Sequence, residues 1–93
     1  MTASIVAKHV LIKGRVQRVG FRGWTVSQAR DLGLSGWVRN LPSGDVELVA
    51  SGPPDKVQAL VEVCRHGSRW AWVEAVQVVG DVPPVDGPFR QRR

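Results

Sequence analysis

The sequence predicts a two-layer α+β sandwich, in which an antiparallel sheet carries two helices on one face. Four stretches are rich in β-branched residues or alternate apolar with polar residues, and two others repeat apolar residues at helical spacing. Along the chain they follow the order strand, helix, strand, strand, helix, strand, which is the split βαβ, ferredoxin-like pattern. Many unrelated functions use this fold, so the fold alone identifies none of them.

The first half of the pattern is a strand followed by a helix. Residues 5–13 are rich in Val and Ile and read as a strand, and a glycine-containing loop follows them. A helix of about ten residues is expected to begin just after Arg22, with Thr25 and Gln28 as a capping box. Gly33 is a typical residue for the end of that helix.

The second half repeats the pattern after a hairpin. Residues 35–41 and 45–50 are expected to form two strands joined by a tight Pro-Ser-Gly turn. A second helix is predicted by apolar residues at positions i, i+3, i+4 and i+7: Val57, Leu60, Val61 and Cys64. Residues 74–79 alternate as a strand does, and residues 80–88 are expected to form a surface loop rich in proline and glycine.

Size and composition describe an ordinary globular protein. A chain of 93 residues is long enough for one domain with one core, and we expect that domain to span residues 1–93. The hydrophobic fraction of 43% and charged fraction of 23% are typical of folded domains. We find no pattern of a signal peptide or of a membrane helix, and the single cysteine fits a reducing compartment. The expected location is therefore the cytoplasm, and the expected state is a monomer.

The most informative stretch is Gly14-Arg15-Val16-Gln17-Arg18-Val19-Gly20-Phe21-Arg22. It leaves a strand, turns and enters a helix, so successive backbone N–H groups can converge on one anion beside the positive end of the helix dipole. Arg22 stands at the helix entrance, where a guanidinium can bind two oxygens of one phosphate. The spacing alone also fits a solvated basic loop before an ordinary helix.

A second candidate is Asn40, which ends the strand 35–41 beside the hairpin turn. Asparagine often forms turns by bonding its own backbone, and the residues alone favour that interpretation. A side-chain amide at such a place can also hold a water molecule, because it offers both a donor and an acceptor.

Together, the two stretches resemble the two signatures of the acylphosphatase family. The first signature, GxVQGVxFR, is matched at every fixed position except that Arg18 stands in place of a glycine. The second, G-aromatic-V-(K/R)-N-x3-G-x-V-x5-G, is matched at every fixed position from Gly36 to Gly52. The resemblance covers nearly the whole chain, and the fold that it implies is the ferredoxin-like sandwich expected from the element order.

The resemblance also implies roles for the matched residues. Arg22 would be the catalytic arginine that binds the phosphoryl group, and Asn40 would position the attacking water. The phosphate would lie in a cradle made mainly by backbone amides: Arg15, Val16, Gln17, Arg18, Val19, Gly20 and Phe21. The implied reaction is in-line attack of water on an acyl phosphate, which releases a carboxylate and orthophosphate without a metal ion or cofactor.

Arg18 is the one departure from the signatures. A glycine in a phosphate cradle usually supplies a positive φ or a close backbone approach. If φ is positive at this position, arginine costs roughly 1–2 kcal/mol of strain and can misaim an amide. If φ is negative, Arg18 only adds charge near the anion. Arg18 is expected to affect the efficiency of the reaction more than its identity.

Other side chains offer little chemistry. His9 and His66 fall on different elements with no third ligand at metal spacing, so we expect both to face solvent and expect no zinc site. The acidic residues are scattered, which argues against a magnesium cluster. Cys64 belongs to the apolar stripe of the second helix, and the tryptophans are expected to pack in the core or on the surface.

Charge and fold leave alternatives open. The net charge of +5 favours an anionic partner, which small acyl phosphates, nucleic acids and anionic membranes all satisfy. An RNA-binding module of the same fold is one alternative, although its aromatic pattern is absent from the central strand. A catalytically impaired phosphate-binding domain, with Arg18 as the lesion, is another. The third is the related module of large carbamoyl-transferring maturation proteins.

Overall fold

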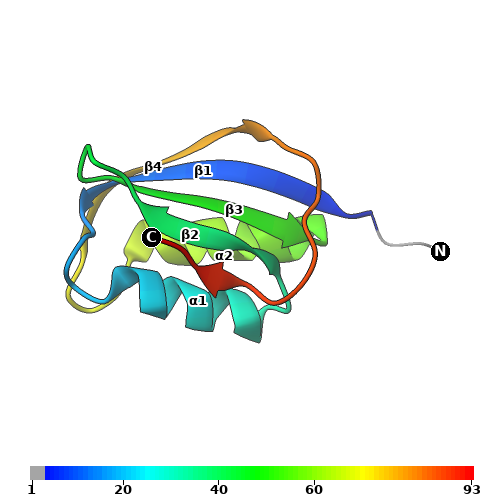
Figure 1. The fold of residues 1–93 in the computed structure, drawn as a ribbon, viewed down its shortest axis with the longest axis horizontal. Coiled ribbons are helices and arrows are strands. Elements are labelled where there is room, and N and C mark those ends of the chain that lie inside the picture. Colours follow the sequence, from blue (N-terminus) through cyan, green and yellow to red (C-terminus); the bar gives the residue numbers. More distant parts are fainter. Residues whose placement is uncertain (1–3) are drawn as a thin grey trace.

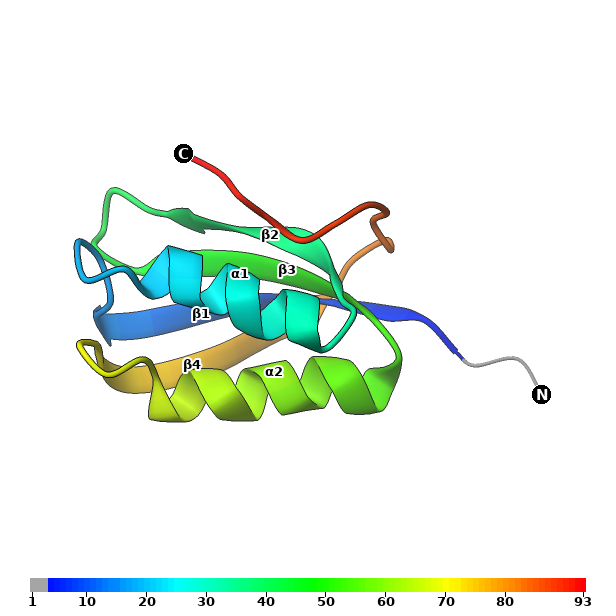
Figure 2. The same cartoon turned by 90° about the horizontal axis from the view of Figure 1, so that it is seen from below.

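The computed structural model describes residues 4–93 and contains two helices and five strands (Figure 1). In chain order these elements are β1 (Val6–Arg15), α1 (Phe21–Asp31), β2 (Ser35–Asn40), β3 (Val46–Gly52), α2 (Pro54–His66), β4 (Trp72–Asp81) and β5 (Arg90–Gln91). The strand order across the sheet is β4-β1-β3-β2-β5. Both helices cover the same face of this sheet (Figure 2). The predicted ferredoxin-like α+β sandwich is therefore confirmed.

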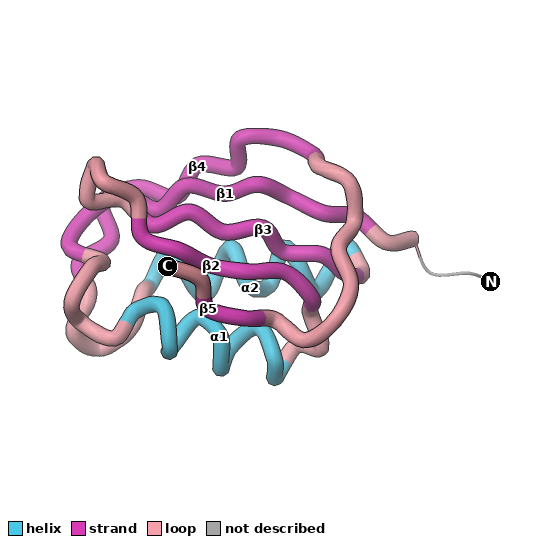
Figure 3. The backbone as a smooth tube through the Cα atoms, viewed as in Figure 1, coloured by secondary structure: helices cyan, strands magenta, loops and turns pink. Residues whose placement is uncertain are grey.

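The sheet differs from the prediction at one edge. Its four long strands are antiparallel, as predicted, but β5 adds a short strand parallel to β2. The loop 82–89 crosses from β4 to that edge (Figure 3), where Phe89 is fully buried. The N–H of Arg92 then donates to the carbonyl oxygen of Val38 at 2.8 Å. A strand of two residues is too short to show any periodicity, so the sequence pattern could not predict it.

Helix α1 begins at Phe21, and the predicted capping box is wrong. Thr25 is fully buried inside the helix, and its hydroxyl donates to the carbonyl oxygen of Phe21 at 2.8 Å. Threonine can satisfy its hydroxyl in this way within a helix, which the S/T-x-x-E/Q pattern does not distinguish from a cap. The helix is instead preceded by Gly20 in a left-handed conformation, with no side-chain cap. Arg22 consequently lies in the first helical turn.

Strand β4 extends two residues beyond the predicted strand at each end. It pairs with β1 along its length, from Lys8 opposite Asp81 to Arg15 opposite Trp72. β4 is an edge strand whose side chains are mostly exposed, so its ends show no alternation of apolar and polar residues. The ends are determined by hydrogen bonding to β1 instead.

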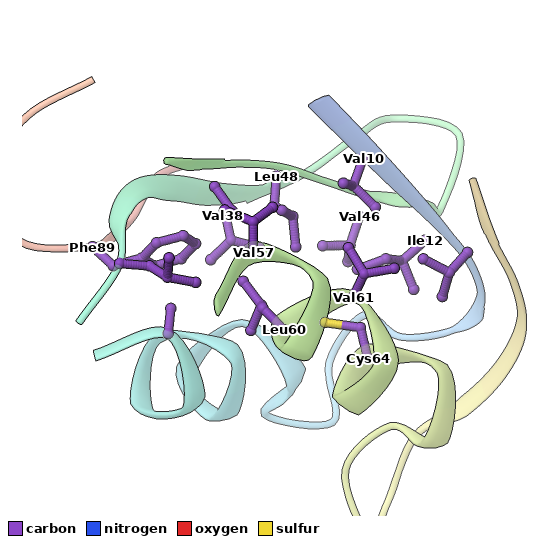
Figure 4. Close-up of a cluster of buried hydrophobic side chains, with 14 of the residues drawn as sticks. Val10, Ile12, Val38, Val46, Leu48, Val57, Leu60, Val61, Cys64 and Phe89 are labelled. Atoms are coloured by element: carbon purple, nitrogen blue, oxygen red, sulfur yellow. The ribbon is translucent and has the colours of Figure 1, made fainter. Parts of the chain in front are cut away.

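The core lies between the sheet and the two helices (Figure 4). The apolar stripe predicted for the second helix is confirmed, since all four of its residues on α2 are buried. Across from them, Val10 and Ile12 of β1 and Val38 of β2 are fully buried. Phe89 fills the core at the β5 edge. Its burial anchors the C-terminal segment to the face of the sheet that α1 covers.

Candidate functional site

A cavity of about 220 Å³ lies where the β1–α1 loop, the first turn of α1, the end of β2 and β5 meet. Its lining residues come from both signature stretches and from the C-terminal segment: Val16, Arg18, Gly20, Phe21, Arg22, Gly23, Asn40 and Gln91. No carboxylate and no histidine is among them. The structure therefore brings Arg22 and Asn40, predicted from separate stretches, to one concave surface.

The β1–α1 loop has the backbone geometry of an anion cradle. Both Arg18 and Gly20 have positive φ, at 64° and 76°. Turns with left-handed residues form concavities lined by N–H groups. Within the described chain, the N–H groups of residues 17–20 donate to no protein acceptor, and they precede the positive end of α1. These donors are free to bind an anion.

Residue 18 adopts the conformation that favours glycine. A left-handed backbone brings the side chain of an L-residue close to its own carbonyl, at a cost of roughly 1–2 kcal/mol. Of the two possibilities stated for Arg18, the positive φ is the one observed. Its side chain is exposed.

The loop is braced against the hairpin turn by Gln17. The Nε2 of Gln17 donates to the carbonyl oxygens of Leu41 and Asp45, each at 2.8 Å. Leu41 follows Asn40 directly, so these two bonds couple the position of the cradle to the position of the Asn40 side chain.

Arg22 is held by the C-terminal segment. Its Nη1 donates to the carbonyl oxygen of Arg92 at 2.8 Å. The remaining guanidinium N–H groups have no protein partner within residues 4–93 and can meet a ligand. A guanidinium fixed at one nitrogen keeps a defined direction at the cost of little additional side-chain entropy on binding.

Asn40 does not form the turn that the residues alone favoured. Its Oδ1 is buried and has no hydrogen-bond partner. A buried polar atom without a partner typically costs about 1–3 kcal/mol, so native structures hold few of them. Asn40 lines the cavity, so a water molecule or ligand donor bound there is a candidate for the missing partner.

Three site residues were missed by reasoning from the sequence: Gly23, which lines the cavity in the first turn of α1, and two residues of the C-terminal segment. Gln91 lines the cavity, and the carbonyl of Arg92 orients Arg22. The signal that could have found these two C-terminal residues is Phe89, a lone large apolar residue after a loop rich in proline and glycine. Such a residue near a chain end indicates that the tail is docked on the core.

The opposite face of the sheet carries a charged cluster, and there the prediction for His9 is wrong. His9 is only 26% exposed, and its Nε2 lies 2.6 Å from Oε2 of Glu47. The Nε of Arg39 donates to Oε1 of the same carboxylate at 2.6 Å. Burial raises the pKa of Glu47, but hydrogen bonds from Arg39 and His9 outweigh it and leave the pKa below its ordinary value. The prediction for His66 is confirmed, since it is exposed.

The remaining reactive groups lie away from the cavity. Burial raises the pKa of the Cys64 thiol to about 12, so it stays protonated, as its predicted place in the core requires. Residues 4–93 contain no group of three His, Cys, Asp or Glu side chains arranged to share a metal ion. In the same range, neither helix is long and apolar enough to cross a membrane.

The tryptophans divide into two groups. Trp24 packs on the core, with its ring 5.3 Å from that of Phe21, and Trp37 lies under the guanidinium of Arg92 at 4.7 Å. Trp70 and Trp72 are 72% and 69% exposed, so packing does not account for them.

A larger cavity of about 380 Å³ lies beside Trp37, between the loop 82–89 and β5. Within the described chain it offers no buried polar side chain without a partner, and no residue of the β1–α1 loop lines it. The smaller cavity is therefore the candidate active site.

Comparison with known proteins agrees with this geometry. The sequence profile of the acylphosphatase family matches residues 8–89. An acylphosphatase of Bifidobacterium longum is 53% identical over 89 residues, which cover 96% of this chain and 91% of the relative. The solved acylphosphatase structures of Coxiella burnetii and Bacillus subtilis superpose with TM-scores of 0.88 and 0.87, at 39% and 32% identity. They cover 95% of this chain, and 93% and 99% of their own chains respectively. The chain therefore belongs to the acylphosphatase family, the enzymes that hydrolyse acyl phosphates.

Proposed function

We propose that the 220 Å³ cavity is the active site, where water attacks the phosphorus of a small acyl phosphate in line with the departing carboxylate. One observation carries the proposal. Residues of the loop that carries the free backbone N–H groups line the same cavity as Arg22 and as Asn40, whose Oδ1 has no partner within residues 4–93.

The first task is to bind the phosphoryl group. The N–H groups of the loop 15–21 and the start of α1 face the negative charge, and Arg22 adds a bidentate partner. Phosphoryl transfer passes through a loose transition state whose charge spreads over three equatorial oxygens, so fixed positive groups stabilise it directly. The bond from Arg22 to the Arg92 carbonyl supports this role, because it orients the guanidinium before substrate arrives.

The second task is to place the attacking water. The Oδ1 of Asn40 would accept a hydrogen bond from that water and thereby gain the partner that it lacks in the protein. Holding the water in line with the breaking P–O bond removes part of the entropic barrier of the reaction.

The proton of the attacking water also needs a destination. The cavity lining contains no carboxylate or imidazole, so we assign the proton to a non-bridging oxygen of the substrate's phosphoryl group. The water oxygen forms the new P–O bond while the bond from phosphorus to the acyl oxygen breaks. The carboxylate leaves with that electron pair, and orthophosphate is the second product. A carboxylate is a good leaving group, so no proton donor is required for it.

The proposed partners are the acyl phosphate and inorganic phosphate, bound by one copy of the chain in the cytoplasm. The single cysteine is buried and forms no disulfide, which suits a reducing compartment.

Hydrolysis of benzoyl phosphate in EDTA tests the proposal. We expect turnover by the wild type, and a loss on the order of 10³-fold or more in Arg22→Ala, the range seen when phosphoryl-transfer enzymes lose a transition-state arginine. The matched control is Arg69→Ala, which removes an exposed arginine that stacks on Trp70 and lines no part of the cavity. Full turnover by a folded Arg22→Ala protein would contradict the site. A wild type that binds phosphate without turnover would instead be the impaired domain.

A further inference from the structure

We propose that Arg18 selects acyl phosphates whose acyl group carries a second negative charge. The inference rests on the proposed function, since it concerns the acyl side of the same cavity. It follows from three observations on Arg18: its backbone conformation, its lack of partners in the fold, and its place beside Arg22.

The first observation is that the fold would favour glycine at this position. Arg18 has a φ of 64° and is the one non-glycine residue with positive φ in the described chain. A long cationic side chain therefore occupies a place where a residue without a side chain would remove backbone strain. Backbone strain that persists at a ligand-binding loop points to a function for the residue that bears it.

The second observation is that the Arg18 side chain makes no contact in the described chain that would stabilise the fold. Within residues 4–93 it forms no ion pair and no hydrogen bond, and it is exposed. It also lies outside the set of residues packed against the core. The side chain thus offers no packing or pairing to offset its strained backbone.

The third observation is that Arg18 lines the same cavity as Arg22, and that this cavity has no carboxylate to neutralise either of them. The free N–H groups, the start of α1 and Arg22 already face one phosphoryl group. Arg18 is a second guanidinium at the exposed rim, so it can pair with an anion that projects out of the cavity. On an acyl phosphate, that anion belongs to the acyl group.

The chemistry of the favoured substrate follows from the guanidinium. Its planar fork matches a carboxylate or a second phosphate, each of which accepts two parallel N–H bonds. Because Arg18 is exposed, the pair is worth only a modest factor, about 1.5- to 5-fold in kcat/KM, and salt should weaken it.

The test compares kcat/KM for benzoyl phosphate with kcat/KM for 4-carboxybenzoyl phosphate. Arg18→Gly removes the charge and accepts the φ of 64° without strain, Arg18→Asn removes the charge with a side chain that tolerates this conformation, and Arg18→Lys keeps the charge. We expect the preference for the carboxylated substrate to fall by about 1.5- to 5-fold in the Gly and Asn variants. Arg18→Lys should retain part of the preference as a point charge, and Arg69→Asn should retain all of it.

An unchanged substrate ratio in both Arg18→Gly and Arg18→Asn would overturn the inference. If kcat/KM also stayed the same for each substrate, Arg18 would have no role in binding the acyl group. If kcat/KM fell equally for both, Arg18 would serve only the shared phosphoryl group. Failure of the proposed function looks different, because the wild type would then hydrolyse neither substrate.

Discussion

The side-chain amide of Gln17 lies 2.8 Å from the carbonyl oxygen of Leu41, and thereby connects the phosphate loop to the β2–β3 turn. The same nitrogen donates to the Asp45 carbonyl, also at 2.8 Å. The two segments lie at the same end of the sheet (Figure 2), but they are 24 residues apart in sequence. Gln17 therefore determines how the proposed cradle sits relative to Asn40.

Replacing Gln17 should impair both stability and catalysis. Gln17→Ala removes two hydrogen bonds, which we expect to lower the free energy of unfolding by about 1–2 kcal/mol. The loosened loop should lower kcat by about 10- to 100-fold, since small misplacements of reacting groups have large effects on rate. Urea unfolding and benzoyl phosphate turnover measure the two effects.

Gln17→Glu sharpens this test. A carboxylate has nearly the same shape but no N–H, so it would face two carbonyl oxygens with its own oxygens. We expect Gln17→Glu to be less stable than Gln17→Ala at pH 7. Gln58→Ala, which breaks an exposed bond to Glu62 on α2, is the control and should change neither property appreciably. If Gln17→Glu were as stable as the wild type, the two hydrogen bonds of Gln17 would not hold the loop on the β2–β3 turn.

Asn40→Ala should separate stability from activity. The Oδ1 of Asn40 has no partner within residues 4–93, so removing it costs no hydrogen bond there and relieves a buried unpaired acceptor. We expect the midpoint of urea unfolding to stay the same or rise, while turnover falls by about 100-fold or more because the water loses its fixed acceptor. A variant that is clearly destabilised but still active would mean that Asn40 serves the fold.

Glu47 should make the stability of the protein depend on pH. Its side chain is only 12% exposed, and hydrogen bonds from Arg39 and His9 hold its pKa below the ordinary value of 4.5 despite the opposing effect of burial. The unfolded chain therefore binds a proton more readily than the folded protein does. The stabilisation by Glu47 is present above about pH 4.5 and is lost as the pH falls through the lowered pKa.

The variant Glu47→Gln measures this contribution. At pH 7 we expect it to be less stable than the wild type by about 1–2 kcal/mol, because charged hydrogen bonds become neutral ones. As the pH falls below 4.5 and through the lowered pKa, the two proteins should converge, since the wild-type carboxylate then becomes protonated as well. Glu74→Gln, an exposed glutamate of β4, is the matched control. A difference that stays constant from pH 7 to pH 3 would contradict the assignment.

The fold was predictable because its long elements carry local signals. The spacing of apolar residues in the sequence predicts both the buried face of α2 and the burial of Val10 and Ile12 in β1. His9 was misjudged because its neighbour Glu47 belongs to another strand, and only the register of β1 on β3 brings them together. Thr25 was misjudged because a buried hydroxyl and a helix cap share one sequence pattern.

The site was predictable only in part. The anion cradle could be predicted because a strand, a glycine-containing loop and a helix follow one another directly in the sequence. Arg22 belongs to the same stretch. Asn40 could be a turn residue or a ligand by sequence alone, and only the packing of the β1–α1 loop beside the β2–β3 turn brings it to the cavity. The sign of φ at Arg18 and the docking of β5 depend on the folded backbone, so spacing could not reveal them.

The last prediction concerns the C-terminal segment. A chain that ends at Phe89 keeps its buried aromatic anchor but loses β5, and Arg22 loses the Arg92 carbonyl. We expect this chain to fold and to turn over benzoyl phosphate about 10- to 100-fold more slowly, because the guanidinium is no longer oriented before binding. The full-length variant Arg93→Ala retains the peptide carbonyl of Arg92 and should match the wild type. Equal rates for the truncated chain and this control would mean that Arg22 needs no such support.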